Sequence, residues 1–477
     1  MLALLVLAPR GVPARRLLPA RACHEACMSA VDTCVADTGW RRRRCRRKLA
    51  ALSAKCRRRG LAVCTDAYPP PTTTTVTTTT STTTAPSLSA PQAIALTGCA
   101  SSGYTAPVTI GAQRFDLVTD SGSTTVAVAS TTCPAADCGS LSPLYGPGGT
   151  AVDLGRTASA LYGDGSTWSG SVFSDLVSPA GSTAAVRMAF AAIDAEQGFF
   201  VPAACNFVDV LDASQGIFGL GGTALAVAGT DSYLDTLARE SALGDTFAVR
   251  VCDSGGTLWL GGYDAAAAAA VPTYTPMVAG TPYYAVTLAD VRIGGSTLGF
   301  DASAFGATLV DIGTTALVLP PAAFAALANA VAAQPVFAQN FGGASWFTGG
   351  FCYTPAQGLT KAELDAALPM LTLAFPSPAG TTFTVDLPAT ESYLLQQNDT
   401  SGTAYYCPGI EQAEGIPTIL GANALHTLLV VVDRVRRQVG FAPSEGCAPL
   451  STTVRVPATG PAPSARPAPP YRRPRRE

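Results

Sequence analysis

Two copies of one short motif constrain this chain more than any other feature. Asp120-Ser-Gly-Ser123 and Asp311-Ile-Gly-Thr314 each follow an apolar, β-prone segment. In each copy we expect a strand that delivers an aspartate to a tight turn, because glycine lets the backbone bend sharply. The last hydroxyl of each motif can donate a hydrogen bond to the aspartate. One such turn occurs in ordinary loops, but two copies 191 residues apart (311 − 120) predict two lobes that share a cleft.

The length and composition of the chain favour a two-lobed body built from strands. With 477 residues, the chain is too long for a single hydrophobic core. Its 46 glycines and 36 prolines lie among alternating Val, Thr and Leu segments, which favours β structure over helix bundles. We expect hairpins over 104–119 and around 161–166, and helices over 232–243 and 322–333. The predicted fold class is all-β with a few short helices.

Shifts in composition divide the chain into six segments. These are a candidate signal or export segment (1–21), a cysteine-rich basic module (22–66), a Thr/Pro-rich linker (67–91), an N-terminal lobe (92–265), a C-terminal lobe (266–450) and a Pro/Arg-rich tail (451–477). The linker and the tail have little apolar surface to bury, so we expect both to be extended or disordered.

The basic module contains six cysteines at helical spacings. They are Cys23, Cys27, Cys34, Cys45, Cys56 and Cys64. We expect a disulfide-stapled helical hairpin preceding the body, with Cys34–Cys45 nearest the turn, although six cysteines allow 15 pairings. Seven of the eight residues in 41–48 are cationic, which predicts contact with an acidic surface polymer or lipid headgroups. A solvated helix face is the alternative.

The ionisable residues exclude several kinds of catalysis. The chain has two histidines, His24 and His426, and neither has a Ser, Asp or Cys partner at a recognisable spacing. We therefore expect neither a serine or cysteine triad nor a histidine-based zinc site, no cofactor, and no nucleic-acid partner.

The charge balance and the cysteines indicate the conditions in which the protein acts. Residues 91–450 contain 10 basic and 28 acidic residues, which favours activity at acid pH, where carboxylates lose charge. The 14 cysteines indicate an oxidising compartment, hence a secreted or extracytoplasmic protein.

Together, these motifs closely resemble the pepsin-like aspartic proteases, over about residues 100–449. The resemblance implies a bilobal fold in which Asp120 and Asp311 form the catalytic dyad. It assigns loop support to Ser121, Gly122, Ser123, Gly313 and Thr314, and a substrate-covering flap to Tyr162, Gly163, Asp164 and Gly165. Segments 216–220 and 419–421 resemble the strands that pass beside the two aspartate loops.

The resemblance also selects among the 105 pairings that eight body cysteines allow. Cys133–Cys138 resembles the small loop bridge of pepsin. Cys252–Cys447 and Cys352–Cys407 resemble the bridges of the beta-secretase branch, which leaves Cys99 for Cys205.

Three features depart from the family pattern. Ile312 replaces the usual Ser or Thr after the second aspartate. Only Ser121 can therefore provide a hydroxyl that hydrogen-bonds to the backbone of the opposite loop. Ala127 stands where pepsins often have a tryptophan that hydrogen-bonds the flap tyrosine. We also expect no inhibitory prosegment before the body, because the cysteine-rich module and the linker occupy that region.

The expected function is an aspartic endopeptidase that acts as a monomer on protein or peptide substrates at acid pH. Two adjacent carboxylates share a proton and activate water without a metal. Two other functions are open. One is a catalytically impaired pepsin-fold binding or inhibitory protein, which Ile312 and Ala127 favour. The other is a cell-surface adhesin in which the basic module carries the function.

Overall fold

A computed structural model describes residues 90–200, 205, 214–399, 401–413, 415–447 and 471–472. All of these residues belong to one of the two compact units into which the chain divides. The candidate export segment, the cysteine-rich module, residues 67–89 of the linker and nearly all of the tail lie outside the described residues. The predictions made for those segments therefore stay predictions.

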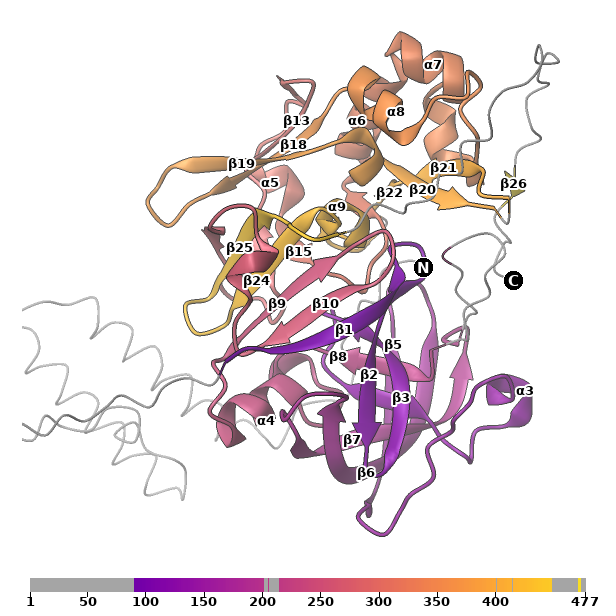
Figure 1. Cartoon of the computed structure of the whole chain (residues 1–477), viewed down its shortest axis with the longest axis vertical. Coiled ribbons are helices and arrows are strands. Elements are labelled where there is room, and N and C mark those ends of the chain that lie inside the picture. Colours follow the sequence, from indigo (N-terminus) through magenta and orange to yellow (C-terminus); the bar gives the residue numbers. More distant parts are fainter. Residues whose placement is uncertain are drawn as a thin grey trace, which may run out of the picture. The chain divides into compact units, whose positions relative to one another are not determined.

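The described chain is built mainly from strands, as the sequence predicts (Figure 1). Thirteen strands form one extended sheet in the order β11-β25-β24-β9-β10-β1-β2-β3-β8-β4-β7-β6-β5. Their bounds are β1 (Gln92–Cys99), β2 (Gly103–Ile110), β3 (Gln113–Asp120), β4 (Val126–Ala129), β5 (Val152–Leu161), β6 (Thr167–Pro179), β7 (Val186–Gln197), β8 (Gly216–Gly219), β9 (Thr246–Val251), β10 (Gly256–Leu260), β11 (Thr273–Pro276), β24 (Leu428–Asp433) and β25 (Gln438–Pro443).

The second half of the chain adds smaller sheets. A five-stranded sheet has the order β12-β15-β23-β16-β22, and a four-stranded sheet has the order β14-β13-β18-β19. Two further pairs are β17–β26 and β20–β21. The bounds are β12 (Ala285–Thr287), β13 (Asp290–Ile293), β14 (Ser296–Thr297), β15 (Ala307–Val310), β16 (Leu317–Leu319), β17 (Phe351–Cys352), β18 (Leu371–Pro376), β19 (Thr382–Leu387), β20 (Leu394–Asn398), β21 (Ala404–Pro408), β22 (Ile410–Gln412), β23 (Ile419–Leu420) and β26 (Tyr471–Arg472).

The helices of the described chain are short. They are α3 (Ala135–Cys138), α4 (Tyr233–Glu240), α5 (Ala302–Phe305), α6 (Pro321–Ala332), α7 (Pro335–Phe341), α8 (Lys361–Ala367) and α9 (Ala422–Leu425), with 3-10 turns η2 (Thr223–Leu225), η3 (Ala265–Ala267), η4 (Ala344–Thr348) and η5 (Ala389–Glu391). Local chemistry sets several of their starts. The Ser232 side chain caps α4, Pro321 occupies the first turn of α6, and Thr360 and Glu363 form a capping box on α8.

One pairing pattern occurs in both halves and positions the two aspartate turns. Strand β3 runs parallel to β8, and strand β15 runs parallel to β23. Segments 216–220 and 419–421 therefore pass beside the turns, as expected from the resemblance. The large sheet draws strands from both predicted lobes, since β11, β24 and β25 come from residues after 265.

Among the described residues, no single helix is long and apolar enough to cross a membrane. Helices α6 and α7, bent by 93° at their junction, meet the length and composition requirements only when taken together.

Candidate active site

The two strand pairs end at two aspartates, each held by a backbone hydrogen bond to the neighbouring segment. Asp120 is the last residue of β3, and its carbonyl oxygen accepts a hydrogen bond from the Leu220 backbone N–H at 2.7 Å. Asp311 follows β15, and its N–H donates to the Leu420 carbonyl oxygen at 3.0 Å. Each aspartate is thus fixed by the strand beside it, and both side chains are fully buried.

Each carboxylate is also held inside its own turn. The Gly122 N–H donates to Asp120 Oδ1 at 2.8 Å, and the Ser123 hydroxyl donates to Oδ2. The second turn repeats this arrangement. Its Gly313 N–H lies 2.9 Å from Asp311 Oδ1, and Thr314 Oγ1 lies 2.6 Å from Oδ2. The hydroxyls predicted from the duplicated motif therefore contact the aspartates as expected.

The two carboxylates lie against the opposite turns. A Cβ atom added to Gly122 would lie 2.7 Å from Asp311 Oδ2, and one added to Gly313 would lie 2.2 Å from Asp120 Oδ1. Both distances are too short for a carbon atom beside a rigidly held oxygen. Glycine is therefore required in both turns by the close approach of the two loops.

Burial raises the pKa values of both aspartates, and the charge of Asp311 adds to the shift of Asp120. Desolvation, together with the charge of Asp311, raises the pKa of Asp120 well above its usual range. Desolvation also raises the pKa of Asp311. Two neighbouring buried carboxyls in this state titrate as one pair and retain a shared proton.

A single hydroxyl links the two turns in both directions. Ser121 Oγ accepts a hydrogen bond from the Ile312 N–H at 3.1 Å and donates to the Val310 carbonyl oxygen at 3.0 Å. The Ile312 side chain is 2% exposed and belongs to the main apolar core. At this position the side chain of the first turn therefore makes hydrogen bonds, whereas the side chain of the second turn packs in the core.

The hairpin of β5 and β6 carries the residues expected in the flap. Asp164 accepts hydrogen bonds from the N–H (2.9 Å) and the hydroxyl (2.6 Å) of Ser166, which orders the tip, and Gly165 provides the positive φ of +85° that the turn requires. The Tyr162 ring is 2% exposed and stacks on Phe199 at a centroid distance of 5.4 Å.

Trp168 supplies the indole that Ala127 does not. Its Nε1–H donates to the Tyr162 hydroxyl at 2.8 Å, from the facing strand of the same hairpin. Ala127 is fully buried and packs in the same small apolar cluster. This contact could have been predicted from the sequence, because Trp168 follows the glycine-rich tip by a few residues. Pairing the two strands of the hairpin places it close to Tyr162.

The structure contains the four disulfides that the resemblance implies. They are Cys99–Cys205, Cys133–Cys138, Cys252–Cys447 and Cys352–Cys407. Among the body cysteines described, none is free.

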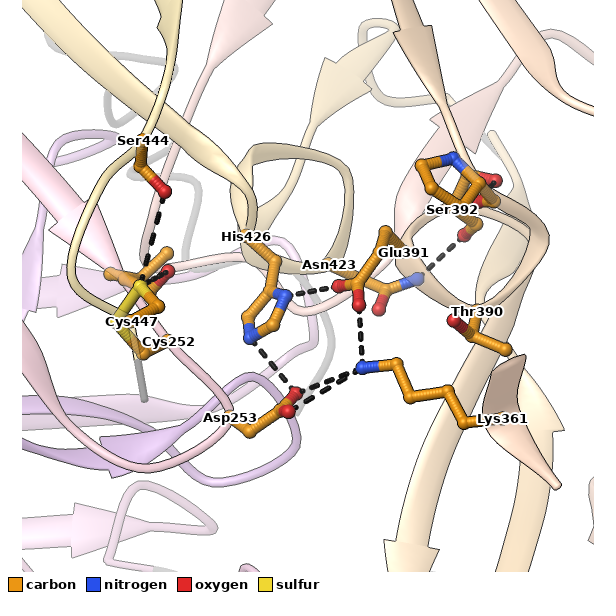
Figure 2. Close-up of polar contacts among 12 residues, drawn as sticks. Cys252, Asp253, Lys361, Thr390, Glu391, Ser392, Asn423, His426, Ser444 and Cys447 are labelled. Atoms are coloured by element: carbon orange, nitrogen blue, oxygen red, sulfur yellow. Dashed lines mark hydrogen bonds and ion pairs between the residues drawn. A yellow bond between two sulfur atoms is a disulfide. The ribbon is translucent and has the colours of Figure 1, made fainter. Parts of the chain in front are cut away.

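His426 has acidic partners that its sequence neighbourhood does not reveal. Its two ring nitrogens contact Asp253 and Glu391, which lie 173 and 35 residues away in the chain (426 − 253 and 426 − 391) (Figure 2). Each of these three side chains offers one atom that could bind a metal ion, and the three atoms lie within 4.8 Å of one another. The Lys361 ammonium also contacts both carboxylates, so the group already contains its own cation.

Comparison with known proteins agrees with this geometry. Residues 103–444 match the family described as eukaryotic aspartyl protease, and the chain belongs to that pepsin-like family. The chain is 31% identical over 240 residues to an aspartic protease of Phaffia rhodozyma, covering 50% of this chain and 56% of the relative. It is 27% identical over 375 residues to a beta-secretase of Strongylocentrotus purpuratus (72% and 66%) and 30% identical over 241 residues to rhizopuspepsin of Rhizopus chinensis (48% and 57%). The matches thus span less than two thirds of each relative's own length.

Proposed function

We propose that this protein is an aspartic endopeptidase whose Asp120–Asp311 pair activates water for peptide-bond hydrolysis at acid pH. The observation that carries the proposal is the mutual approach of the two turns, in which each glycine faces the opposite carboxylate. Family membership implies peptide substrates. By analogy with the family, we expect a preference for apolar side chains on both sides of the scissile bond.

The proposed reaction uses the single proton that the two aspartates share. The ionised carboxylate takes a proton from water as the water oxygen bonds to the peptide carbonyl carbon. The protonated carboxyl donates to the carbonyl oxygen, which gives a diol. The C–N bond then breaks as the carboxyl that took the water proton gives it to the amine nitrogen, and the other carboxylate takes a proton from a diol hydroxyl, which restores the single shared proton. The backbone N–H and hydroxyl donors of each turn keep the carboxylates fixed during these transfers. Tyr162 and Gly163–Gly165 are proposed to cover the bound peptide.

The pH dependence of hydrolysis tests this proposal. The pair must hold one proton, so we expect cleavage of a denatured protein to be fastest below about pH 5 and to fall as the shared proton is lost. A statine-type inhibitor should block the activity. Cleavage that peaks at neutral pH and resists the inhibitor would assign the chemistry elsewhere.

An impaired binding protein remains the second candidate, and Ile312 is the observation that favours it. The missing hydroxyl leaves the loop of Asp311 with one less hydrogen-bonding group than the loop of Asp120. The complete set of turn donors around both carboxylates favours the active enzyme.

The four disulfides and the family both indicate an extracytoplasmic location. We further propose secretion as a monomer, with residues 41–48 holding the protein at an acidic cell surface. Deleting residues 1–90 and measuring proteolysis and surface retention separately would distinguish this arrangement from an adhesin. We expect the protein that lacks residues 1–90 to lose its retention at the cell surface and to keep full proteolytic activity.

A further inference from the structure

Four ionisable side chains outside the aspartate pair form one compact ion cluster (Figure 2). His426 Nε2 lies 3.0 Å from Asp253 Oδ1, and its Nδ1 contacts Glu391 Oε2. Lys361 Nζ lies 2.5 Å from Glu391 Oε1 and 3.4 Å from Asp253 Oδ2. We refer to Asp253, Lys361, Glu391 and His426 as the ion cluster.

The ion cluster joins parts of the chain that are distant in sequence. Asp253 lies in the turn between β9 and β10, which belong to the large sheet. Lys361 begins α8, Glu391 ends η5, and His426 directly follows α9. The cluster therefore ties the large sheet to three helical segments of the second half.

The charges in the ion cluster balance when His426 is protonated. Burial alone would lower the pKa of His426, but its contacts with the Asp253 and Glu391 carboxylates raise it to about 9. Burial alone would raise the pKa of Asp253, but the close contact and the charge of His426 hold it at about 2. Two cations then face two anions, and removing the His426 proton leaves a buried excess of negative charge.

The helix that precedes His426 contacts the loop of Asp311. The Ala422 N–H, at the start of α9, donates to the Thr314 carbonyl oxygen at 2.7 Å, and the Asn423 N–H donates to Thr315 at 3.0 Å. Thr314 is the residue whose hydroxyl holds Asp311. One short helix therefore connects the ion cluster to the candidate active site.

The same helix is anchored beside Glu391. Asn423 Nδ2–H donates to the Ser392 carbonyl oxygen at 2.5 Å. A cavity of about 80 Å³ borders the cluster and is lined by Asp253, Glu391, Asn423 and His426, among others. That volume is enough for water beside His426.

We propose that the ion cluster is a pH-dependent latch that positions α9, and through it the loop of Asp311, while His426 is protonated. His426 is a positioning residue in this scheme, since it acts through Thr314. The catalytic part of the proposal rests on the proposed function, whereas the stability part does not.

The other charged and titratable groups around His426 do not change state in the relevant pH range. Lys361, on α8, has a pKa held above its ordinary value by Glu391 and Asp253 against the effect of burial, so it stays charged. Burial raises the pKa values of Tyr104 on β2 and Tyr406 on β21, so both stay neutral. Asp365, on α8, also faces Glu391, and burial raises its pKa from the ordinary value of 3.8.

The sign of the pH effect follows from the raised pKa of His426. The stabilisation is complete below the ordinary value of 6.5 and is lost as pH rises through about 9. Wild-type protein should therefore lose thermal stability between pH 6.5 and 9.5, and His426→Gln should lose much less over the same range.

Arg434→Gln is the matched control for this experiment. Arg434 bridges Asp235 and Asp245 with a cation that does not titrate in this range. Its removal should lower Tm by a similar amount at every pH from 6.5 to 9.5. Equal pH profiles for wild type and His426→Gln would overturn the latch.

Proton NMR provides a second readout because the full chain contains only two histidines. The resonance absent from His426→Gln is that of His426, and in wild type it should titrate well above 6.5. Should His426→Gln fail to fold, Glu391→Gln keeps the imidazole and should move this titration to lower pH. Titration of His426 at its ordinary value would contradict the proposal.

Kinetics at pH 4 separate positioning from a purely structural role. We expect His426→Gln to lower kcat roughly tenfold, because small misplacements of reacting groups slow chemistry, while KM stays near the wild-type value. Unchanged kcat in a folded variant would refute the positioning role. An inactive wild type would refute the proposed function instead, and the melting and NMR results would still decide the latch.

A metal-binding role is the alternative outcome of these tests. Adding Zn²⁺ at pH 8 should leave the Tm of wild type unchanged, because Lys361 already contacts both carboxylates. A rise in Tm that Glu391→Gln abolishes would assign the cluster to a metal and overturn the latch.

Discussion

Ile312 is the residue at which the two aspartate turns differ. Ser121 occupies the equivalent position in the first turn, and its hydroxyl contacts both the Ile312 N–H and the Val310 carbonyl oxygen. The Ile312 side chain offers only buried apolar surface in return. The geometry around Asp311 thus depends more on packing than the geometry around Asp120 does.

Ile312→Thr should be at least neutral for stability and should raise kcat several-fold. A restored hydrogen bond contributes ~1 kcal/mol net, and each ~1.4 kcal/mol corresponds to a tenfold change in rate. Melting curves and initial rates at the optimum pH, measured beside wild type, test this.

The control for this substitution is Ser121→Ala, which removes the hydroxyl that is present and should lower both stability and rate. A slower, less stable Ile312→Thr would mean that the core has adapted to the isoleucine and leaves the new hydroxyl unpaired.

At the scale of elements, the glycines of the two turns set how closely the loops approach. Gly313→Ala places a methyl group against Asp120 and should reduce kcat/KM at least tenfold, because the carboxylate must move. Gly148→Ala is the matched control, since a Cβ there meets nothing within 4 Å, and it should keep wild-type activity. Rates and melting curves of the two variants decide the outcome. Full activity in Gly313→Ala would contradict the tight approach of the loops.

The sequence predicted elements well where a local pattern was enough. The hairpin over 104–119 appears as β2 and β3, and the helices over 232–243 and 322–333 appear as α4 and α6, within three residues at each end. Capping and proline chemistry mark these helix starts. Partners that meet only in the folded chain were missed. The indole of Trp168 reaches Tyr162 across a hairpin, and His426 meets Asp253 across 173 residues (426 − 253).

At the scale of the whole described body, long-range contacts join the two halves. The Tyr284 hydroxyl donates to the Leu220 carbonyl oxygen at 2.7 Å, and Cys252–Cys447 closes a separation of 195 residues. The duplicated motif predicted that two halves share a site, and the family resemblance predicted the Cys252–Cys447 bridge. The hydrogen bond from Tyr284 to Leu220 was not predicted, because it depends on the packing of complete lobes, which short sequence patterns do not encode.

The most direct test of catalysis by the aspartate pair compares wild type with Asp120→Asn and Asp311→Asn at acid pH. Asparagine keeps the shape of the side chain but cannot act as the general base or share the proton. Turnover of a denatured protein substrate should therefore disappear in each variant, while circular dichroism and thermal melts show an intact fold. Substantial residual hydrolysis in either folded variant would contradict catalysis by the aspartate pair.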